Sequence, residues 1–188
     1  MSGKLDRRKK YTRKVLKESL IILLAEKKIA DITVKEICEI ADINRSTFYT
    51  HYTDHYDLLH KIEAEITEDM KQYLQNYSYE KEEESQQMTE KILEYIIDNK
   101  RMFQTLLTSD SASSFEQKMM ELARSFMLNN WMSDSKVEKE ESEYFSSFVI
   151  SGAIHVIKDW IRNDMTQPPG QMAAMIHTFI NHGFSYVE

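Results

Sequence analysis

Residues that form turns or cross-links are scarce in this chain of 188 residues. It holds 1 cysteine, 2 prolines and 4 glycines, and such low numbers argue against a turn-rich all-β fold. One cysteine excludes an internal disulfide framework and fits a reducing compartment. No apolar run approaches the roughly 20 residues that a membrane-spanning helix needs. The charged start MSGKLDRRKK lacks the apolar core of a signal peptide. We therefore expect a helical, cytoplasmic protein with no membrane partner.

Positive charge is concentrated at one end of the chain. The net charge is −7, but residues 1–60 hold 12 basic and 9 acidic side chains, whereas the remaining residues hold 12 and 22. Within the first 17 residues there are 8 basic side chains and 1 acidic one. A basic segment of this kind raises phosphate affinity and steers association with nucleic acid. A solvated basic tail is the alternative interpretation of residues 4–10.

The segment from Thr33 to Leu59 predicts two short helices joined by a tight turn. Thr33 and Glu36 have the spacing of a capping box, which predicts a helix from Val34. Apolar residues at 34, 37, 38 and 41 give that helix one buried face. The turn 42–44, Asp-Ile-Asn, consists largely of residues that tolerate left-handed backbone and cap helices. A helix-turn-helix of this form places its second helix in the major groove of DNA.

The second helix, predicted over about 45–51, has the composition of a recognition helix. Only Phe48 is large, apolar and directed inward, and the neighbouring side chains are hydrogen-bond donors or cations. Arg45 lies in the first turn, where side chains reach base edges, and Arg paired with guanine is the commonest specific contact. We predict that Arg45 reads a base, with a phosphate contact as the alternative. Thr33, at a helix N-terminus, is predicted to hold a phosphate.

These motifs resemble the DNA-binding domain of the TetR/AcrR family of bacterial regulators. The resemblance runs from Tyr11-Thr12-Arg13 through T-V-x-x-I-x-x-x-A and N-R-S-T-F-Y-T-H-Y to D-x-x-D-L-L, and covers about 50 residues. This chain departs from the family at Asp42, where Gly is usual, and at His55, where a phosphate-binding Lys is usual. The resemblance and the sequence together give a predicted set of DNA contacts: Thr33, Arg45, Ser46, Thr47, Tyr49, His51 and His55.

Periodic apolar residues predict an all-α protein with two modules. The DNA-binding helix-turn-helix domain is expected over 1–53 and a regulatory and dimerisation domain over 54–188. Helices are expected over 8–27, from 55 for about five turns, over 88–99, 101–107, 115–131 and 140–163, and after Gly170. The acidic run 80–85 and the Ser-rich stretch 108–114 are expected to be loops. The long helix after Asp54 would connect the two modules.

The last two helices carry more apolar surface than one small domain can bury. Helix 140–163 is apolar on two sides, and a helix of that kind must bury both. Pairing with a second copy would cover the excess, and the resemblance implies dimerisation through these two helices. A two-fold dimer also presents two recognition helices to a palindrome. The predicted interface residues are Ile150, Ile154, Ile157, Ile161, Met172, Ile176, Phe179, Ile180 and Gly183.

Methionines and aromatic residues in the middle of the chain suit a pocket for an apolar or aromatic molecule. A plain helical core with methionine as gap filler explains each of these residues equally well. The resemblance implies a small effector that releases DNA. The candidate lining residues are Met102, Phe103, Leu106, Met119, Phe126, Met127, Trp131, His155 and Trp160.

Catalytic and metal-binding patterns are missing from the sequence. There is no glycine-rich phosphate loop, nucleophile elbow or spaced acid pair. His51 and His55 flank a turn between two helices, and His177 and His182 are five residues apart, so neither pair places both rings on one face of one helix. We expect no cofactor and no metal. Cys38 is expected to be a small core residue. The sequence therefore predicts a homodimeric repressor that binds a palindromic operator in double-stranded DNA and is released by a small effector. The alternatives are an activator, or a regulator gated by a protein partner, and a helical metabolic enzyme.

Overall fold

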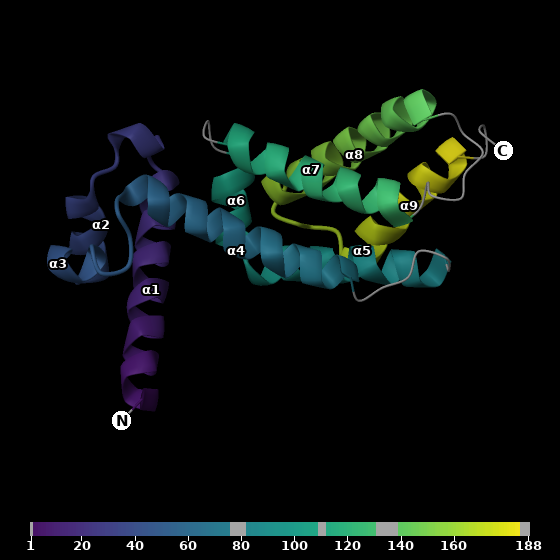
Figure 1. Cartoon of the computed structure of the whole chain (residues 1–188). Helices are drawn as coiled ribbons and strands as arrows, with labels where there is room; N and C mark the ends of the chain where they lie inside the picture. Colours follow the sequence, from purple (N-terminus) through teal and green to yellow (C-terminus); the bar gives the residue numbers. More distant parts are fainter. Residues whose placement is uncertain (1, 76–81, 109–111, 131–138, 185–188) are drawn as a thin grey trace.

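The computed structural model describes residues 2–75, 82–108, 112–130 and 139–184, and every regular element in these ranges is helical. The N-terminal elements, at one end of Figure 1, are α1 (Ser2–Leu24), the 3-10 turn η1 (Ile29–Asp31), α2 (Val34–Ala41) and α3 (Arg45–Phe48). The long helix α4 (His55–Gln75) leads from them into the second half of the molecule. That half contains α5 (Glu82–Asp98), α6 (Lys100–Thr108), α7 (Ala112–Asn130), α8 (Lys139–Arg162) and α9 (Pro169–Phe184).

One hydrophobic core runs through both halves. At the N-terminal end, Leu16, Leu20, Ile37 and Phe48 are fully buried, and Leu58 at the start of α4 joins them. The core continues along α4 through Ile62, Ile66 and Met70 into the C-terminal helices. The long helix predicted after Asp54 is confirmed, and α4 belongs to the core of both halves.

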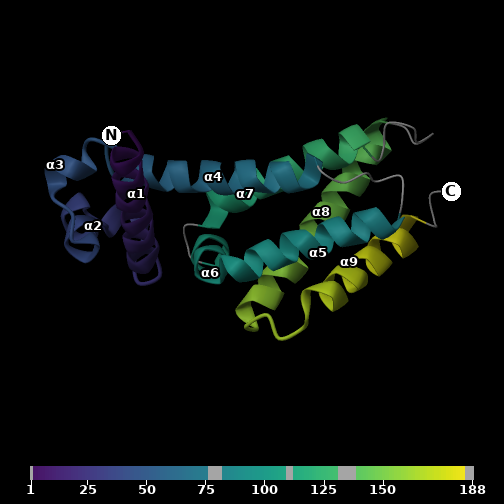
Figure 2. The ribbon, with the colours of Figure 1, turned by 90° about the horizontal axis from the view of Figure 1, so that it is seen from below.

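The C-terminal helices pack around α5, α6 and α7 (Figures 1 and 2). Helix α9 lies along α5, and α8 packs against α6 and α7. Between α8 and α9 the chain turns through Asp164 and Met165, both with positive φ, and the Trp160 indole donates to the Gln167 carbonyl at 3.0 Å. Pro169 begins α9 at the first helical position, where its missing N–H has no helical partner to lose.

Several predicted boundaries were wrong. Helix α1 begins at Ser2 instead of residue 8, so the basic N-terminal residues are helical, and it ends at Leu24. Helix α3 ends at Phe48, and residues 49–51 form a turn instead of a last helical turn. Helix α5 begins at Glu82 and α7 at Ala112, so part of each predicted loop is helical. These segments are polar, but glutamate and alanine favour helices, and hydrophobic pattern alone does not show where a polar helix starts.

Candidate DNA interface and ligand cavity

Capping hydrogen bonds fix the start of α2. Thr33 Oγ1 accepts from the Glu36 N–H at 3.3 Å, and Glu36 Oε2 accepts from the Thr33 N–H at 2.9 Å. The predicted capping box is therefore confirmed. Lys27 also donates to Glu36 Oε1 at 2.5 Å. The hydrogen bonds from Lys27 and then from Thr33 lower the pKa of Glu36 from 4.5 to about 2, so this network is charged and intact at neutral pH.

The turn between α2 and α3 is set by its first and last residues. Asp42 adopts a left-handed conformation, φ 52° and ψ 45°, where the resembling family has Gly. Asn44 caps α3, because its side-chain oxygen accepts from the Ser46 N–H at 3.1 Å. Phe48 is fully buried beneath α3 and contacts the rings of Tyr49 and Tyr52. These interactions hold the polar face of α3 outward.

The predicted DNA contacts lie on that outer face with different exposures. Arg45 and Ser46 are exposed, and Arg45 forms no ion pair with any residue that the structure describes. Tyr49 is 57% exposed, and Thr33 is exposed at the start of α2. Thr47 and His51 are partly buried. The structure thus brings six of the seven residues to one end of the molecule with side chains at or near the surface.

Two histidines follow α3, and neither supplies the positive charge that a lysine would supply to a DNA phosphate. Burial, and then the positive charges of Arg13, Lys9 and Lys61, lower the pKa of His51. His51 is therefore neutral at pH 7 and offers a hydrogen bond instead of a charge. His55 stacks on Tyr56 with ring centres 4.3 Å apart, and its Nε2 is buried without a hydrogen-bond partner among the described residues. That nitrogen is not presented to a phosphate.

Three cations near His51 were absent from the predicted set of contacts. Lys9 and Arg13 lie one turn apart on α1, and both act on the His51 ring. Lys61 of α4 donates to the His51 carbonyl at 3.2 Å and to Asp57 at 2.9 Å, and it lies 5.1 Å from the centre of the Tyr52 ring. The basic composition of residues 1–17 signalled the first two residues, but nothing in the sequence places Lys61 beside His51.

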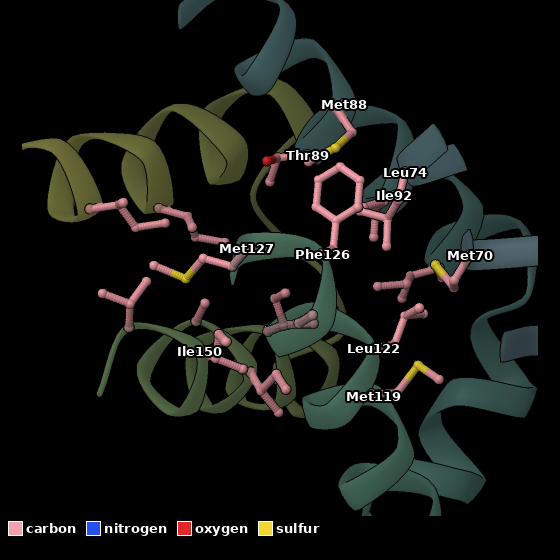
Figure 3. A pocket seen from close by; sticks show the side chains of 18 of the residues that line it. Met70, Leu74, Met88, Thr89, Ile92, Met119, Leu122, Phe126, Met127 and Ile150 are labelled. Carbon is pink, nitrogen blue, oxygen red and sulfur yellow. The ribbon is translucent and has the colours of Figure 1, made fainter. Parts of the chain in front are cut away.

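A cavity of about 230 Å³ lies inside the C-terminal half, lined by α4 to α9 (Figure 3). Most of its wall is aliphatic or methionine side chain, including Met70, Ile92 and Ile154, and among the described residues no carboxylate, lysine or arginine lines it. The polar groups are Ser85, Thr89 and His177. Ser85 Oγ and His177 Nε2 share a hydrogen bond of 2.6 Å, and Thr89 donates to the Ser85 carbonyl at 3.1 Å. All three belong to the paired helices α5 and α9.

Four of the nine predicted pocket residues line this cavity. They are Phe103, Met119, Phe126 and Met127. Leu106 and Trp160 are buried elsewhere in the core, and Met102 lines a separate groove. The His155 side chain is 70% exposed and lies 3.6 Å from Asp159. Trp131 lies outside the described residues. The sequence showed which helices have apolar faces, but it did not show which sides of those faces meet around a hollow.

The isoleucines assigned to the dimer interface are buried or half-buried within their own chain. Five of the predicted interface residues line the cavity instead: Ile150, Ile154, Ile157, Ile176 and Ile180. Ile161 is 0% exposed and Met172 is 4% exposed. The burial of Gly183 is outside the described residues. Among the described residues of the predicted interface, Phe179 is the one with a mostly exposed side chain, at 65%. Two residues of α8 outside the predicted set are also mostly exposed, Phe148 at 81% and Tyr144 at 73%. Within the chain, α5, α6 and α7 cover the isoleucine side of α8 and α9, whereas Phe179 of the predicted set stays exposed. The dimer interface stays a prediction.

An ion pair between a buried carboxylate and a partly exposed lysine connects α4 to the cavity wall. The Glu63 side chain is 2% exposed and accepts from Lys118 of α7 at 2.5 Å and from Ser114 Oγ at 3.2 Å. Removing the lysine is costly, because the buried carboxylate loses its partner. Lys118 is followed by Met119, which lines the cavity. The helix that forms one wall of the cavity is thus held to the helix that reaches the DNA-binding end.

Comparisons with known proteins agree with this architecture. A family model described as a transcriptional regulator C-terminal region of TetR type matches residues 83–182, which is more than half of the chain. The chain belongs to the TetR family of transcriptional regulators. A curated Bacillus subtilis (strain 168) protein, the uncharacterized HTH-type transcriptional regulator YxbF, is 37% identical over 59 residues. That match covers 31% of this chain and only 14% of the relative's length.

Solved structures share the fold at low sequence identity. A TetR transcriptional regulator from Streptococcus agalactiae 2603V is 19% identical with a TM-score of 0.67, covering 96% of this chain and 99% of that one. The dihydroxyacetone kinase operon activator DhaS is 18% identical with a TM-score of 0.63, covering 93% and 97%. The all-α fold and the family assignment are confirmed, and this TetR-family chain is a DNA-binding transcriptional regulator with a helix-turn-helix.

Two further findings concern membranes and metals. Among the helices that the structure describes, none combines the length and the apolar character needed to cross a membrane. Within the same ranges, no three side chains among histidine, cysteine, aspartate and glutamate gather as a metal site would need. Cys38 is buried, and burial raises the pKa of its thiol.

Proposed function

We propose that this regulator is a homodimeric repressor that leaves its operator when a small, neutral, mainly apolar molecule enters the cavity. The observation that carries the proposal is that α7 both lines the cavity and binds α4 through Lys118 and Glu63. Repression by occupancy needs only a DNA-binding face and a dimer, whereas activation needs an additional surface for the transcription machinery.

The exposed apolar residues of α8 and α9 support a dimer. Phe148 and Phe179 are large, apolar and mostly exposed in the single chain. Tyr144 and Met175, at 73% and 38%, extend the same two helices' exposed surface. Exposed apolar area of this kind on a soluble protein marks an interaction site. A second copy of the chain supplies the matching surface under two-fold symmetry and sets two α3 helices at a palindromic site.

The cavity indicates the class of ligand. A 150 Å³ apolar cavity holds benzene, so about 230 Å³ suits a molecule of roughly eight to ten non-hydrogen atoms. An ionised group would lose its hydration without gaining a counter-charge from the described part of the wall, where no carboxylate, lysine or arginine stands. One hydroxyl or carbonyl can be hydrogen-bonded at Ser85, Thr89 and His177. The ligand is therefore expected to be a substituted ring or short chain with one neutral polar group.

Coupling to DNA follows from the helices that line the cavity. Met119, Leu122 and Phe126 present α7 to the ligand, and Met70 and Leu74 present α4. A ligand that fits only when α7 is displaced changes the position of Glu63, and with it the direction of α4. An effector shifts the equilibrium only by the difference in its affinity for the two states, so this displacement must differ between the DNA-bound and released forms.

A matched series of probes tests the proposal by thermal shift. We expect 4-propylphenol to stabilise the protein most, propylbenzene less, and 4-methylbenzoate, which is as large as the phenol, least, because the first has a neutral polar group and the last a buried charge. A free ligand concentration of 100 times the dissociation constant should raise the free energy of unfolding by about 2.7 kcal/mol. Ala123→Phe fills the cavity and should abolish the shift, whereas Ala64→Phe, an exposed position on α4, should preserve it.

Three outcomes would contradict the proposal. They are a benzoate that binds best, a shift that survives Ala123→Phe, and the absence of any shift across the series and a broad screen of neutral compounds. The last result would favour the alternative in which a protein partner gates the regulator.

A further inference from the structure

A second hollow, separate from the cavity, lies between α1 and the corner where α5 meets α6. This groove has a volume of about 940 Å³, within the range of sites for drug-sized and cofactor-sized ligands. Cations stand on both of its walls. Those of α1 are Lys9, Lys10, Arg13, Lys14 and Lys17, and those of α6 are Lys100 and Arg101.

Four of these seven cations have no carboxylate partner among the side chains that the structure describes. Lys17 pairs with Glu65, Lys14 lies 3.7 Å from Glu18, and Lys100 lies 3.0 Å from Asp164. Within the described residues, the other four cations form no ion pair: Lys9, Lys10, Arg13 and Arg101. Asp98 is the one groove acid without a cation partner in those ranges. The groove therefore keeps an excess of about three positive charges, which low-dielectric walls focus on anything that enters.

The groove also has apolar surface. Ile21, Ile22, Ile97 and Met102 line it between the cations. Ile97 is 37% exposed, although it lies on a helix that is otherwise well packed. An inorganic ion gains no binding free energy from this apolar surface, whereas the organic part of a ligand can bury it.

The α6 wall of the groove is directed away from the recognition helix, whereas Lys9 and Arg13 of the α1 wall also lie near His51. In both Figure 1 and Figure 2, α1 stands between α3 on one side and α6 on the other. Lys100 and Arg101 therefore lie across α1 from Arg45. A DNA duplex that receives α3 meets the opposite side of α1, so operator phosphates do not account for the cations of the α6 wall.

We propose that this groove binds a small organic polyanion, of the kind represented by a nucleoside polyphosphate, and thereby fastens α1 to α6. Phosphate oxygens meet the unpaired lysines and arginines, and arginine in particular binds phosphate through two parallel N–H groups. The base and sugar cover Ile97 and Met102. Because α1 belongs to the DNA-binding end and α6 to the C-terminal half, an occupied groove sets the angle between them. This site does not depend on the apolar cavity or its ligand.

Isothermal titration of the full-length protein tests the site. The probes are ATP, inorganic tripolyphosphate and adenosine, in a buffer of about 0.15 M ionic strength, where long-range attraction is screened, and without divalent cations. We expect ATP to bind saturably and more tightly than tripolyphosphate, and adenosine not to bind. Arg101→Glu and Lys10→Glu should each weaken ATP at least about tenfold. Lys71→Glu is the matched control, because Lys71 is an exposed lysine of α4 outside the groove.

Each alternative result overturns a defined part of this inference. If Arg101→Glu and Lys71→Glu lower the affinity for ATP equally, ATP binding depends only on the net charge of the protein and not on the groove. Equal affinities for ATP and tripolyphosphate mean that the apolar surface plays no part and the ligand is not organic. If ATP does not bind and Arg101→Glu instead weakens random duplex DNA, the groove is a contact for the DNA backbone. Thermal shifts by 4-propylphenol should persist in Arg101→Glu, which separates a failure here from a failure of the cavity.

Discussion

The two ends of this regulator are stabilised in different ways. Around α2 and α3, short-range hydrogen bonds from Thr33, Glu36 and Asn44 fix the backbone, and one fully buried ring, Phe48, fixes the packing. In the C-terminal half, the helices enclose a cavity whose wall consists mainly of isoleucine side chains and of methionine side chains, which are flexible. Methionine-rich walls re-pack at little cost. Under the proposed function, the recognition surface needs a fixed shape and the sensing domain needs two shapes of similar free energy, and the construction of each end suits that role.

The same truncation at each end gives the largest expected effect. Phe48→Ala and Phe103→Ala each remove a ring that is at most 1% exposed, at a cost of about 3–5 kcal/mol. Phe48→Ala should abolish operator binding while the thermal shift with 4-propylphenol persists. Phe103→Ala should change ligand binding, because Phe103 lines the cavity. Parallel loss of both activities in both variants would show that the two ends do not differ in the way described.

Charge on the outer face of α8 and α9 is expected to separate the dimer. Phe148→Glu with Phe179→Glu places like charges across a two-fold axis without altering the chain's own interior, because both rings are mostly exposed. Sedimentation should give a monomer, and operator affinity should fall because one half-site is lost. Ile154→Glu is the contrasting variant, since Ile154 faces the cavity and its replacement should unfold the C-terminal half. A double variant that stays dimeric would place the interface elsewhere.

Base reading is expected to depend on Arg45. Arg45→Ala should weaken the cognate operator by about 1–3 kcal/mol and relax preference at one base pair in each half-site. Lys61→Ala, beside His51, should weaken all duplexes alike and reduce the salt dependence by about one charge. Electrophoretic mobility assays on operator and random DNA distinguish the two effects. An equal loss on both DNAs in Arg45→Ala would show that Arg45 contacts phosphate.

The capping network predicts a small effect of pH. Because the folded pKa of Glu36 is depressed to about 2, its contribution to stability is present above 4.5 and is lost as pH falls from 4.5 toward 2. In urea unfolding between those pH values, Glu36→Gln should be less stable at the upper end and should converge with the wild type at the lower end. Glu39 is an exposed neighbour on α2, and Glu39→Gln should keep the pH dependence of stability of the wild type. The same pH dependence in all three proteins would show that the network does not contribute to stability.

These differences also explain what the sequence could predict. The signals of α2, the turn and α3 are local, since a cap, a left-handed residue and a second cap lie within twelve residues of each other, and the structure confirms all three. The apolar sides of α8 and α9 were visible too. Their partners were not, because α5 and α7 approach them only in three dimensions. Ile150, Ile154 and Ile157 of α8 were thus predicted at the dimer interface, and they line the cavity. Lys61 reaches His51 across ten residues for the same reason.

The most direct test of ligand gating is the operator affinity of the full-length protein with and without saturating 4-propylphenol, repeated in Glu63→Gln. We expect the wild type to bind operator at least about tenfold more weakly with the ligand, and operator DNA to weaken the ligand by the same factor. In Glu63→Gln, which removes the charge that holds α7 to α4, the ligand should still bind but the factor should shrink toward one. Unchanged operator affinity in a wild-type protein whose cavity is shown to be filled would contradict the account.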